Sequence, residues 1–128
     1  MIQNLKVRMD IESLRAYCLT LTGVSEELPF GPDTLVFKVR SKIFLLTGME
    51  APLAFNVKCD PERAVLLREE YPCVKPGFHM NKKHWNTIES DGSVSDALLI
   101  SWIDHSYQTV VAGLSKKEQM ALATEREV

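Results

Sequence analysis

Apolar and polar residues alternate along this chain with two different periods, which distinguish predicted helices from predicted strands. Near the start, apolar side chains recur every three or four positions, as they do on one face of a helix. These positions are Leu14, Tyr17, Cys18 and Leu21. Asp10 precedes them as a suitable N-cap, and Met9 and Leu14 are spaced as a hydrophobic staple. The pattern predicts a helix over residues 10–21, with Gly23 just past its end.

A period of two follows and predicts strands. Two segments alternate in this way, at residues 35–39 and 53–57, and a more apolar strand is expected between them through Leu46. Short turns separate them, so they are expected to form an antiparallel meander. Residues 25–33 contain two prolines and a glycine and are predicted to be a loop.

The second half of the chain begins with a helix start at Asp60-Pro61-Glu62, an N-cap acid followed by proline and a second acid. This helix should run to about Glu70, and two short strands are expected around residues 81–83. A longer helix is predicted over residues 94–112, and a capping box at residues 115–118 should begin a last short helix. The order α-β-β-β-α-β-β-α-α predicts an α+β fold, with an antiparallel sheet of about five strands and helices on one face.

The composition is that of one ordinary globular domain. The chain has 128 residues, of which 45% are hydrophobic and 25% are charged. We expect a loose N-terminal arm at residues 1–9 and a single domain at residues 10–128. No apolar run approaches the ~20 residues that span a bilayer, and the N-terminus lacks the apolar region of a signal peptide. A cytoplasmic protein with no membrane partner is therefore expected.

The three cysteines, Cys18, Cys59 and Cys73, are odd in number and have no CxxC spacing. Reduced and mostly buried thiols are the favoured interpretation. Tyr107 falls in the apolar stripe of the helix predicted over residues 94–112. Its ring should therefore be in the core, with its hydroxyl reaching a partner. Asp104 or His105 is either that partner or a connection between this helix and the basic hairpin.

Candidate catalytic and metal-binding groups do not form a recognisable site. Asp104, His105 and Ser106 are consecutive on one predicted helix, so their side chains point about 100° apart and cannot converge on one atom. His79 and His84 have a spacing that matches no compact zinc signature. We therefore expect no catalytic residues, no metal and no cofactor.

The strongest functional signal is a basic segment on an acidic protein. Residues 73–88 hold three lysines and two of the three histidines but no acid, whereas the whole chain has a net charge of −2. The aromatic residues Phe78 and Trp85 stand among amide and cationic side chains, a combination that suits phosphates and bases. It also suits an ordinary exposed hairpin. Lys82 and Lys83 should lie at or beside the hairpin tip, where they can reach phosphate.

The sequence does not decide which side chains of this hairpin face solvent and which face the core. Trp85 either stacks on a base or packs as a core or half-buried residue, and both interpretations have similar weight. If Phe78 and Met80 pack inward, His79 and Asn81 face solvent.

A second cationic cluster, Lys38, Arg40 and Lys42, surrounds the turn of the first predicted hairpin. These residues could contact nucleic acid, or they could be solvated charges on an edge strand that deter aggregation.

Four separated segments resemble the MmcQ/YjbR family of small bacterial proteins, in the same order and spacing. They are Leu28-Pro29-Phe30-Gly31, residues 37–44 with Phe37-Lys38-Val39 and Lys42-Ile43-Phe44, residues 75–87, and Asp104-His105-Ser106-Tyr107. The resemblance covers about residues 10–119. It implies a frataxin-like (CyaY-like) fold and DNA binding through a double-wing arrangement of β-hairpins. Acidic residues are sparse in the first predicted helix, so the fold similarity does not bring frataxin iron chemistry with it.

The resulting expectation is a non-catalytic DNA-binding protein. The residues expected to contact DNA are Arg40, Lys42, Lys75, His79, Asn81, Lys82, Lys83, His84 and Trp85. The alternative is a non-enzymatic module that binds a protein partner or a small ligand.

Overall fold

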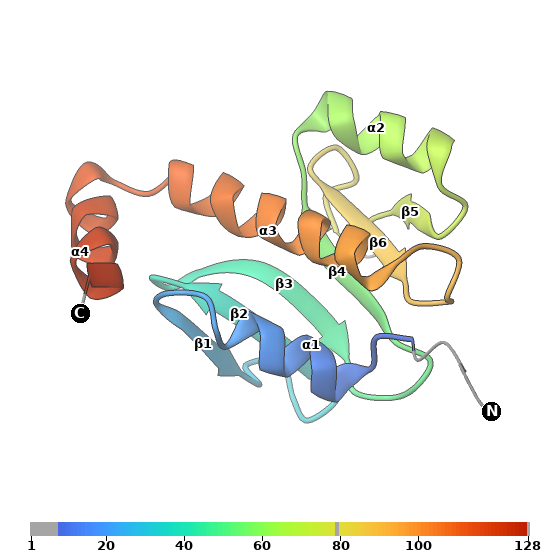
Figure 1. Ribbon diagram of the computed structural model, residues 1–128, viewed down its shortest axis with the longest axis horizontal. Helices are drawn as coiled ribbons and strands as arrows, with labels where there is room; N and C mark the ends of the chain where they lie inside the picture. Colours follow the sequence, from blue (N-terminus) through green and yellow to red (C-terminus); the bar gives the residue numbers. More distant parts are fainter. Residues whose placement is uncertain (1–7, 79, 128) are drawn as a thin grey trace.

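The computed structural model describes residues 8–78 and 80–127, which form one six-stranded antiparallel sheet and four helices. The helices are α1 (Ile11–Cys18), α2 (Pro61–Glu70), α3 (Asp96–Ala112) and α4 (Lys116–Glu127). The strands are β1 (Val24–Glu27), β2 (Thr34–Val39), β3 (Lys42–Gly48), β4 (Ala54–Lys58), β5 (Val74–Pro76) and β6 (Trp85–Glu89). Their order in the sheet is β1-β2-β3-β4-β6-β5, and α1 and α3 run across the sheet (Figure 1). The predicted α+β fold is confirmed, with six strands in place of about five.

The helices begin where their capping residues predicted. The side chain of Asp10 accepts a 2.9 Å hydrogen bond from the backbone N–H of Ser13, and Asp60 accepts one of 3.3 Å from Arg63. Ser95 and Ser115 cap the two later helices in the same way. Each cap satisfies an N–H that the helix itself leaves without a partner, and typically contributes ~1 kcal/mol.

The segment between the first helix and the first predicted strand differs from the prediction. The helix predicted over residues 10–21 ends at Cys18, and β1 occupies residues 24–27, where a loop was predicted. Gly23 reverses the chain with a φ of +75°, a conformation that favours glycine. The segment then pairs with β2 through Val24↔Val39 to Glu27↔Val36. Its polar sequence has no strand pattern of its own, so the neighbouring strand supplies the reason for its conformation.

The core lies between the helices and one face of the sheet. Phe37, Leu45 and Val57 are neighbours across three strands and are almost fully buried. Met9 and Leu14, the predicted staple, are also buried. Residues 1–7 of the predicted N-terminal arm lie outside the described residues. No helix in the described ranges is long and apolar enough to cross a membrane.

Buried polar side chains join the layers. Ser106 of α3 donates a 2.6 Å hydrogen bond to the carbonyl oxygen of Phe44 and accepts one of 2.8 Å from the backbone N–H of Lys58. The Tyr107 ring packs in the core as predicted, but its hydroxyl donates to the carbonyl oxygen of Thr22, at 2.6 Å, and not to Asp104 or His105. The alternative in which Asp104 or His105 is the partner is therefore wrong, because the acceptor comes from Thr22, 85 positions away in the sequence.

The opposite face of the sheet carries half-buried side chains. Strand alternation places Asn56 and Lys58 of β4 and Trp85 and Thr87 of β6 on this face. In β3, Ile43 and Leu46 are both half-buried, whereas Phe44 and Leu45 between them are both buried, because the register with β2 shifts at this point. The buried residues of α1, α2 and α3 belong to the other side, where Asn86 of β6 donates a hydrogen bond to the carbonyl oxygen of Ala64 in α2. We call the face without these helices the uncovered face.

Candidate functional site

A groove of about 500 Å³ lies on the uncovered face. Its lining combines strand residues with residues from two loops: Thr34, Ile43, Leu46, Thr47, Gly48, Asn56 and Trp85 from the strands, and Phe30, Phe78 and Met80 from the loops. This volume is within the usual range of small-molecule sites, about 300–1,000 Å³. The floor is β3, β4 and the start of β6, and the two loops are connected to β2 and β5 on either side of these strands.

Two phenylalanines at this groove are unusually exposed. Phe30, in the loop before β2, is 66% exposed, and Phe78, in the loop between β5 and β6, is 67% exposed. Trp85 is half-buried, so it is neither a core tryptophan nor a freely exposed one. Large apolar side chains that remain exposed close together are typical of a binding surface.

Phe78 does not meet the condition of packing inward, because residues 77, 78 and 80–84 lie outside the strands and strand alternation does not apply to them. Gly77 is buried and its N–H donates to the carbonyl oxygen of Trp85 at 2.9 Å. The N–H of Phe78 donates to the hydroxyl of Thr87 at 2.9 Å, and that hydroxyl donates to the Asn56 side chain at 2.5 Å. These bonds fix the backbone of Phe78 on the uncovered face.

The loop between β5 and β6 presents Lys82 and Lys83 to solvent. The backbone carbonyl of Asn81 accepts from the N–H groups of His84 and Trp85, and its side-chain oxygen accepts from Lys83 N–H at 2.9 Å. A 3.2 Å hydrogen bond from Arg68 of α2 to the carbonyl oxygen of Lys82 holds the same loop. Lys82 and Lys83 are exposed, and within the described ranges no acid lies within ion-pair distance of either. His84 is half-buried, and His79 lies outside the described residues.

The other predicted cations are less available. Arg40 lies 3.3 Å from a carboxylate oxygen of Glu125, and Lys75 lies 3.8 Å from Glu89. Lys38 forms a 3.1 Å ion pair with Glu27 of β1. Because β1 pairs with β2, Lys38 does not lie on an edge strand. The interpretation of Lys38, Arg40 and Lys42 as edge-strand charges is therefore wrong. Lys42 is exposed and has no ion-pair partner among the described residues.

One residue of the groove and one cation beside it were missed by the sequence prediction. Phe30 belongs to a segment predicted only as a loop, and only the tertiary fold brings it to the same groove as Phe78. Lys58 is half-buried directly opposite Trp85 in the sheet register. Lys58 is two positions from Asn56, and this spacing could have placed both side chains on one face of the sheet.

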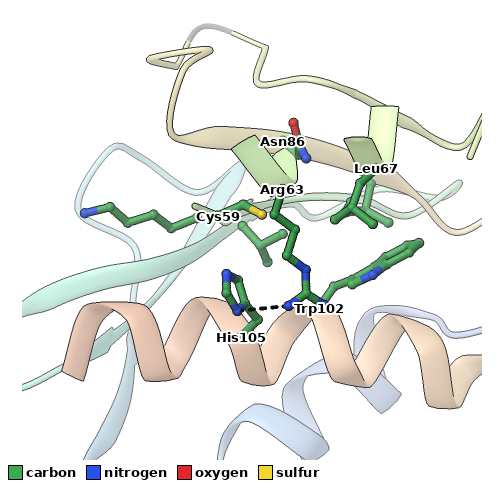
Figure 2. A pocket seen from close by; sticks show the side chains of 9 residues that line it. Cys59, Arg63, Leu67, Asn86, Trp102 and His105 are labelled. Atoms are coloured by element: carbon green, nitrogen blue, oxygen red, sulfur yellow. Dashed lines mark hydrogen bonds between the residues drawn. The ribbon is translucent and has the colours of Figure 1, made fainter. Parts of the chain in front are cut away.

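A second cavity, between α2, α3 and the sheet, holds only about 10 Å³ (Figure 2). Its lining includes Cys59, Arg63 and His105. That volume is about the space of one water molecule, so the cavity is too small for a substrate. Figure 2 shows His105 directed at Arg63, whose guanidinium nitrogen is 3.5 Å from Nδ1, while the N–H of Asp60 lies 3.4 Å from Nε2.

His105 is consequently a link between helices. A neutral imidazole offers one acceptor nitrogen, and protonation would remove it. Burial lowers the pKa of His105, and the positive charge of Arg63 lowers it further, although Asp60 opposes this effect. The ring is therefore neutral near pH 7.

The side chains of Asp104, His105 and Ser106 diverge, as predicted. Asp104 accepts a hydrogen bond from Tyr17 of α1, His105 faces α2, and Ser106 contacts backbone groups of β3 and β4. The three cysteines are free and buried, which confirms that prediction. Burial is the main cause that raises the pKa of Cys18 to about 12, which disfavours its thiolate. No group of three or more potential metal ligands occurs in the part of the chain that the structure describes.

Comparison with known proteins places this geometry in a family. The chain is 41% identical to the uncharacterized protein YbdF of Escherichia coli O157:H7 over 109 residues, which cover 84% of this chain and 89% of that protein. It is 32% identical to the uncharacterized protein YjbR of Escherichia coli strain K12 over 115 residues, covering 89% of this chain and 98% of that protein.

Solved structures share the fold. The crystal structure of Deinococcus radiodurans protein DR2400 aligns with a TM-score of 0.85 at 38% identity, covering 93% of this chain and 92% of that one. A structure from Pseudomonas syringae aligns with a TM-score of 0.70 at 25% identity, covering 79% of this chain and 98% of that one. The YjbR family model matches residues 19–109, and with these relatives the chain belongs to the YjbR family.

Proposed function

We propose that this protein binds DNA without catalysing a reaction, and that the loop at residues 77–84 and the adjoining groove form its interface. The observation that carries the proposal is the position of Lys82 and Lys83. Both are exposed on the same loop as Phe78, and no acid among the described residues is within ion-pair distance of either. Lysines of this kind contact phosphate, and adjacent aromatic side chains contact bases.

The cations of the two hairpins differ in how available they are to bind phosphate. Arg40 at the first hairpin already faces Glu125, so binding phosphate there would require breaking an ion pair. Lys42 is the remaining cation of that hairpin, beside Ile43 in the groove. We therefore place most of the phosphate contact on the loop between β5 and β6.

The absence of a catalytic role is part of the proposal. Asp104, His105 and Ser106 are each engaged with different neighbouring elements. We also place the protein in the cytoplasm, because three free, buried thiols are typical of a reducing compartment.

A second candidate function is a non-enzymatic module for a small apolar ligand. The groove volume of about 500 Å³ and the exposed Phe30 and Phe78 favour it. The two candidates differ in their response to salt, because phosphate binding releases counterions whereas apolar binding does not.

The test is a fluorescence-polarisation titration with random-sequence duplex and single-stranded oligonucleotides at two salt concentrations. Replacing Lys82 and Lys83 together by alanine should weaken binding and lower the salt slope by about 1 for each lysine. The matched control replaces Lys116 and Lys117, two exposed lysines of α4, and removes the same charge. Equal affinity for the two double variants would exclude the loop from the interface and favour the small-ligand function.

A further inference from the structure

The uncovered face suggests which form of nucleic acid it binds. We infer that the groove stacks unpaired bases, so that the protein binds single-stranded DNA in preference to duplex. The inference rests on the proposed function and names its ligand class. It depends on three features of the groove: exposed aromatic faces, an uneven distribution of charge, and polar side chains that are already bonded.

The aromatic side chains come from both sides of the groove floor. Phe30 precedes β2, and Phe78 follows β5, whereas β3, β4 and β6 lie between those strands in the sheet. Both rings are about two-thirds exposed, at 66% and 67%, and Trp85 lies half-buried in the floor. A duplex hides the faces of its bases in the stack, so only unpaired bases can lie against such rings.

Charge is divided between the two ends of the groove. Lys58 stands opposite Trp85, and Lys82 and Lys83 immediately precede His84 and Trp85 in the chain. The other end, near Gly48, adjoins a hollow lined by Asp33 and Glu50. A polyanion is therefore attracted to the Trp85 end and repelled from the Gly48 end, which favours phosphates beside the lysines.

Most polar groups in the groove floor are engaged within the protein. The hydroxyl of Thr47 bonds the carbonyl oxygens of Gly48 and Ala54. The side-chain nitrogen of Asn56 donates to the carbonyl oxygen of Leu46, and the side-chain oxygen of Asn56 accepts from the hydroxyl of Thr87. Reading a base sequence requires side-chain donors and acceptors that are free to meet base edges. The groove is consequently suited to stacking that tolerates any base.

The experiment compares three probes with the full chain at low salt. They are a single-stranded oligonucleotide of about 10 nucleotides, the same length of backbone with abasic sites at every position, and a duplex of the same length. The first two carry the same phosphates and differ only in their bases. The base-bearing single strand should bind about 10-fold more tightly than the abasic strand, since stacking contributes about 1–3 kcal/mol per base, and more tightly than the duplex.

Variants then locate the stacking surface. Phe30→Ala and Phe78→Ala should each lower the affinity for the base-bearing strand several-fold and leave the affinity for the abasic strand unchanged. Leu66→Ala, at a 61% exposed position on α2, is the matched control and should change neither affinity. Circular dichroism of each variant verifies the fold, which should persist because these side chains are largely exposed.

Two outcomes overturn the inference. One is equal binding of the abasic and base-bearing strands, and the other is tighter binding of the duplex. In either case, salt-dependent binding that requires Lys82 and Lys83 would leave the proposed function standing. No binding of any probe at low salt would instead overturn the proposed function itself.

Discussion

The N–H of Gly77 donates a 2.9 Å hydrogen bond to the carbonyl oxygen of Trp85, and the two backbones approach so closely that a side chain has no room between them. A Cβ atom at Gly77 would lie 2.8 Å from both the Cβ and the carbonyl oxygen of Trp85. This contact closes the loop that carries Phe78, Lys82 and Lys83. The position of the candidate interface therefore depends on a residue that has no functional group.

We predict that Gly77→Ala destabilises the protein by about 1–3 kcal/mol, because the overlap involves backbone atoms and cannot be relieved by rotating a side chain. Urea denaturation measures the change. Gly48→Ala is the control, since a Cβ there meets no atom within 4 Å, and it should leave the unfolding free energy almost unchanged. Equal stability of the two variants would contradict the role assigned to Gly77.

Removing the hydroxyl of Ser106 should cost about 1–3 kcal/mol. Ser106→Ala leaves the carbonyl oxygen of Phe44 and the N–H of Lys58 without that partner in the interior, and such groups lose their full solvation. Ser101→Ala, on an exposed position of the same helix, removes a hydroxyl that bonds only the Leu98 carbonyl and should change stability by less than about 0.5 kcal/mol. Thermal or urea unfolding of both variants provides the comparison.

The pKa of His105 should rise when Arg63 loses its charge. Burial is the first cause of the low pKa and the positive charge of Arg63 is the second, so Arg63→Gln removes only the second. An NMR titration of the imidazole measures the direction. Arg68→Gln is the control, because it removes a positive charge from the same helix at a residue that bonds the carbonyl oxygen of Lys82 and not His105. It should raise the pKa of His105 less than Arg63→Gln does.

His105 also predicts a pH dependence of stability. Its pKa in the folded protein is below its unfolded value of about 6.5, so the unfolded chain binds the proton more readily. The contribution to stability is complete above pH ~6.5 and decreases as the pH falls toward the folded pKa. Urea unfolding of the original protein and of His105→Gln from pH 8 to 5 should show a steeper loss in the original protein. Parallel curves would contradict the prediction.

The two tryptophans should differ in their contribution to stability. Trp102 is 3% exposed in the core and in contact with Tyr71, so Trp102→Ala should cost about 3–5 kcal/mol. Trp85 is half-buried, and Trp85→Ala should cost about 1–2 kcal/mol because it removes less buried apolar area. Comparable losses would mean that Trp85 is mainly a structural residue.

Features encoded by residues close in sequence were predictable. The caps at Asp10, Asp60 and Ser115 each involve a partner three residues away. The core stripe containing Trp102 and Ile103 follows helical periodicity and is buried. The same locality explains why Asp104, His105 and Ser106 could be recognised as divergent.

Features that depend on distant partners could not be predicted. Arg40 meets Glu125, 85 positions away, so its charge appeared available in the sequence. Phe30 reaches the groove of Phe78 only after the sheet has formed. The strand at residues 24–27 is polar and acquires its conformation from β2. In each case the deciding contact joins residues with no periodic relation in sequence.

The short outer strands limit how the sheet can associate. β1 has four residues, including the acids Glu26 and Glu27, and β5 has three, ending with Pro76. Strands that are short, charged or interrupted by proline are poor templates for another β-strand. Extension of the sheet by an added strand is therefore disfavoured at both edges, even though aromatic side chains are exposed nearby. A partner of the aromatic groove therefore meets the broad face of the sheet, and the groove is accessible without favouring edge-to-edge aggregation.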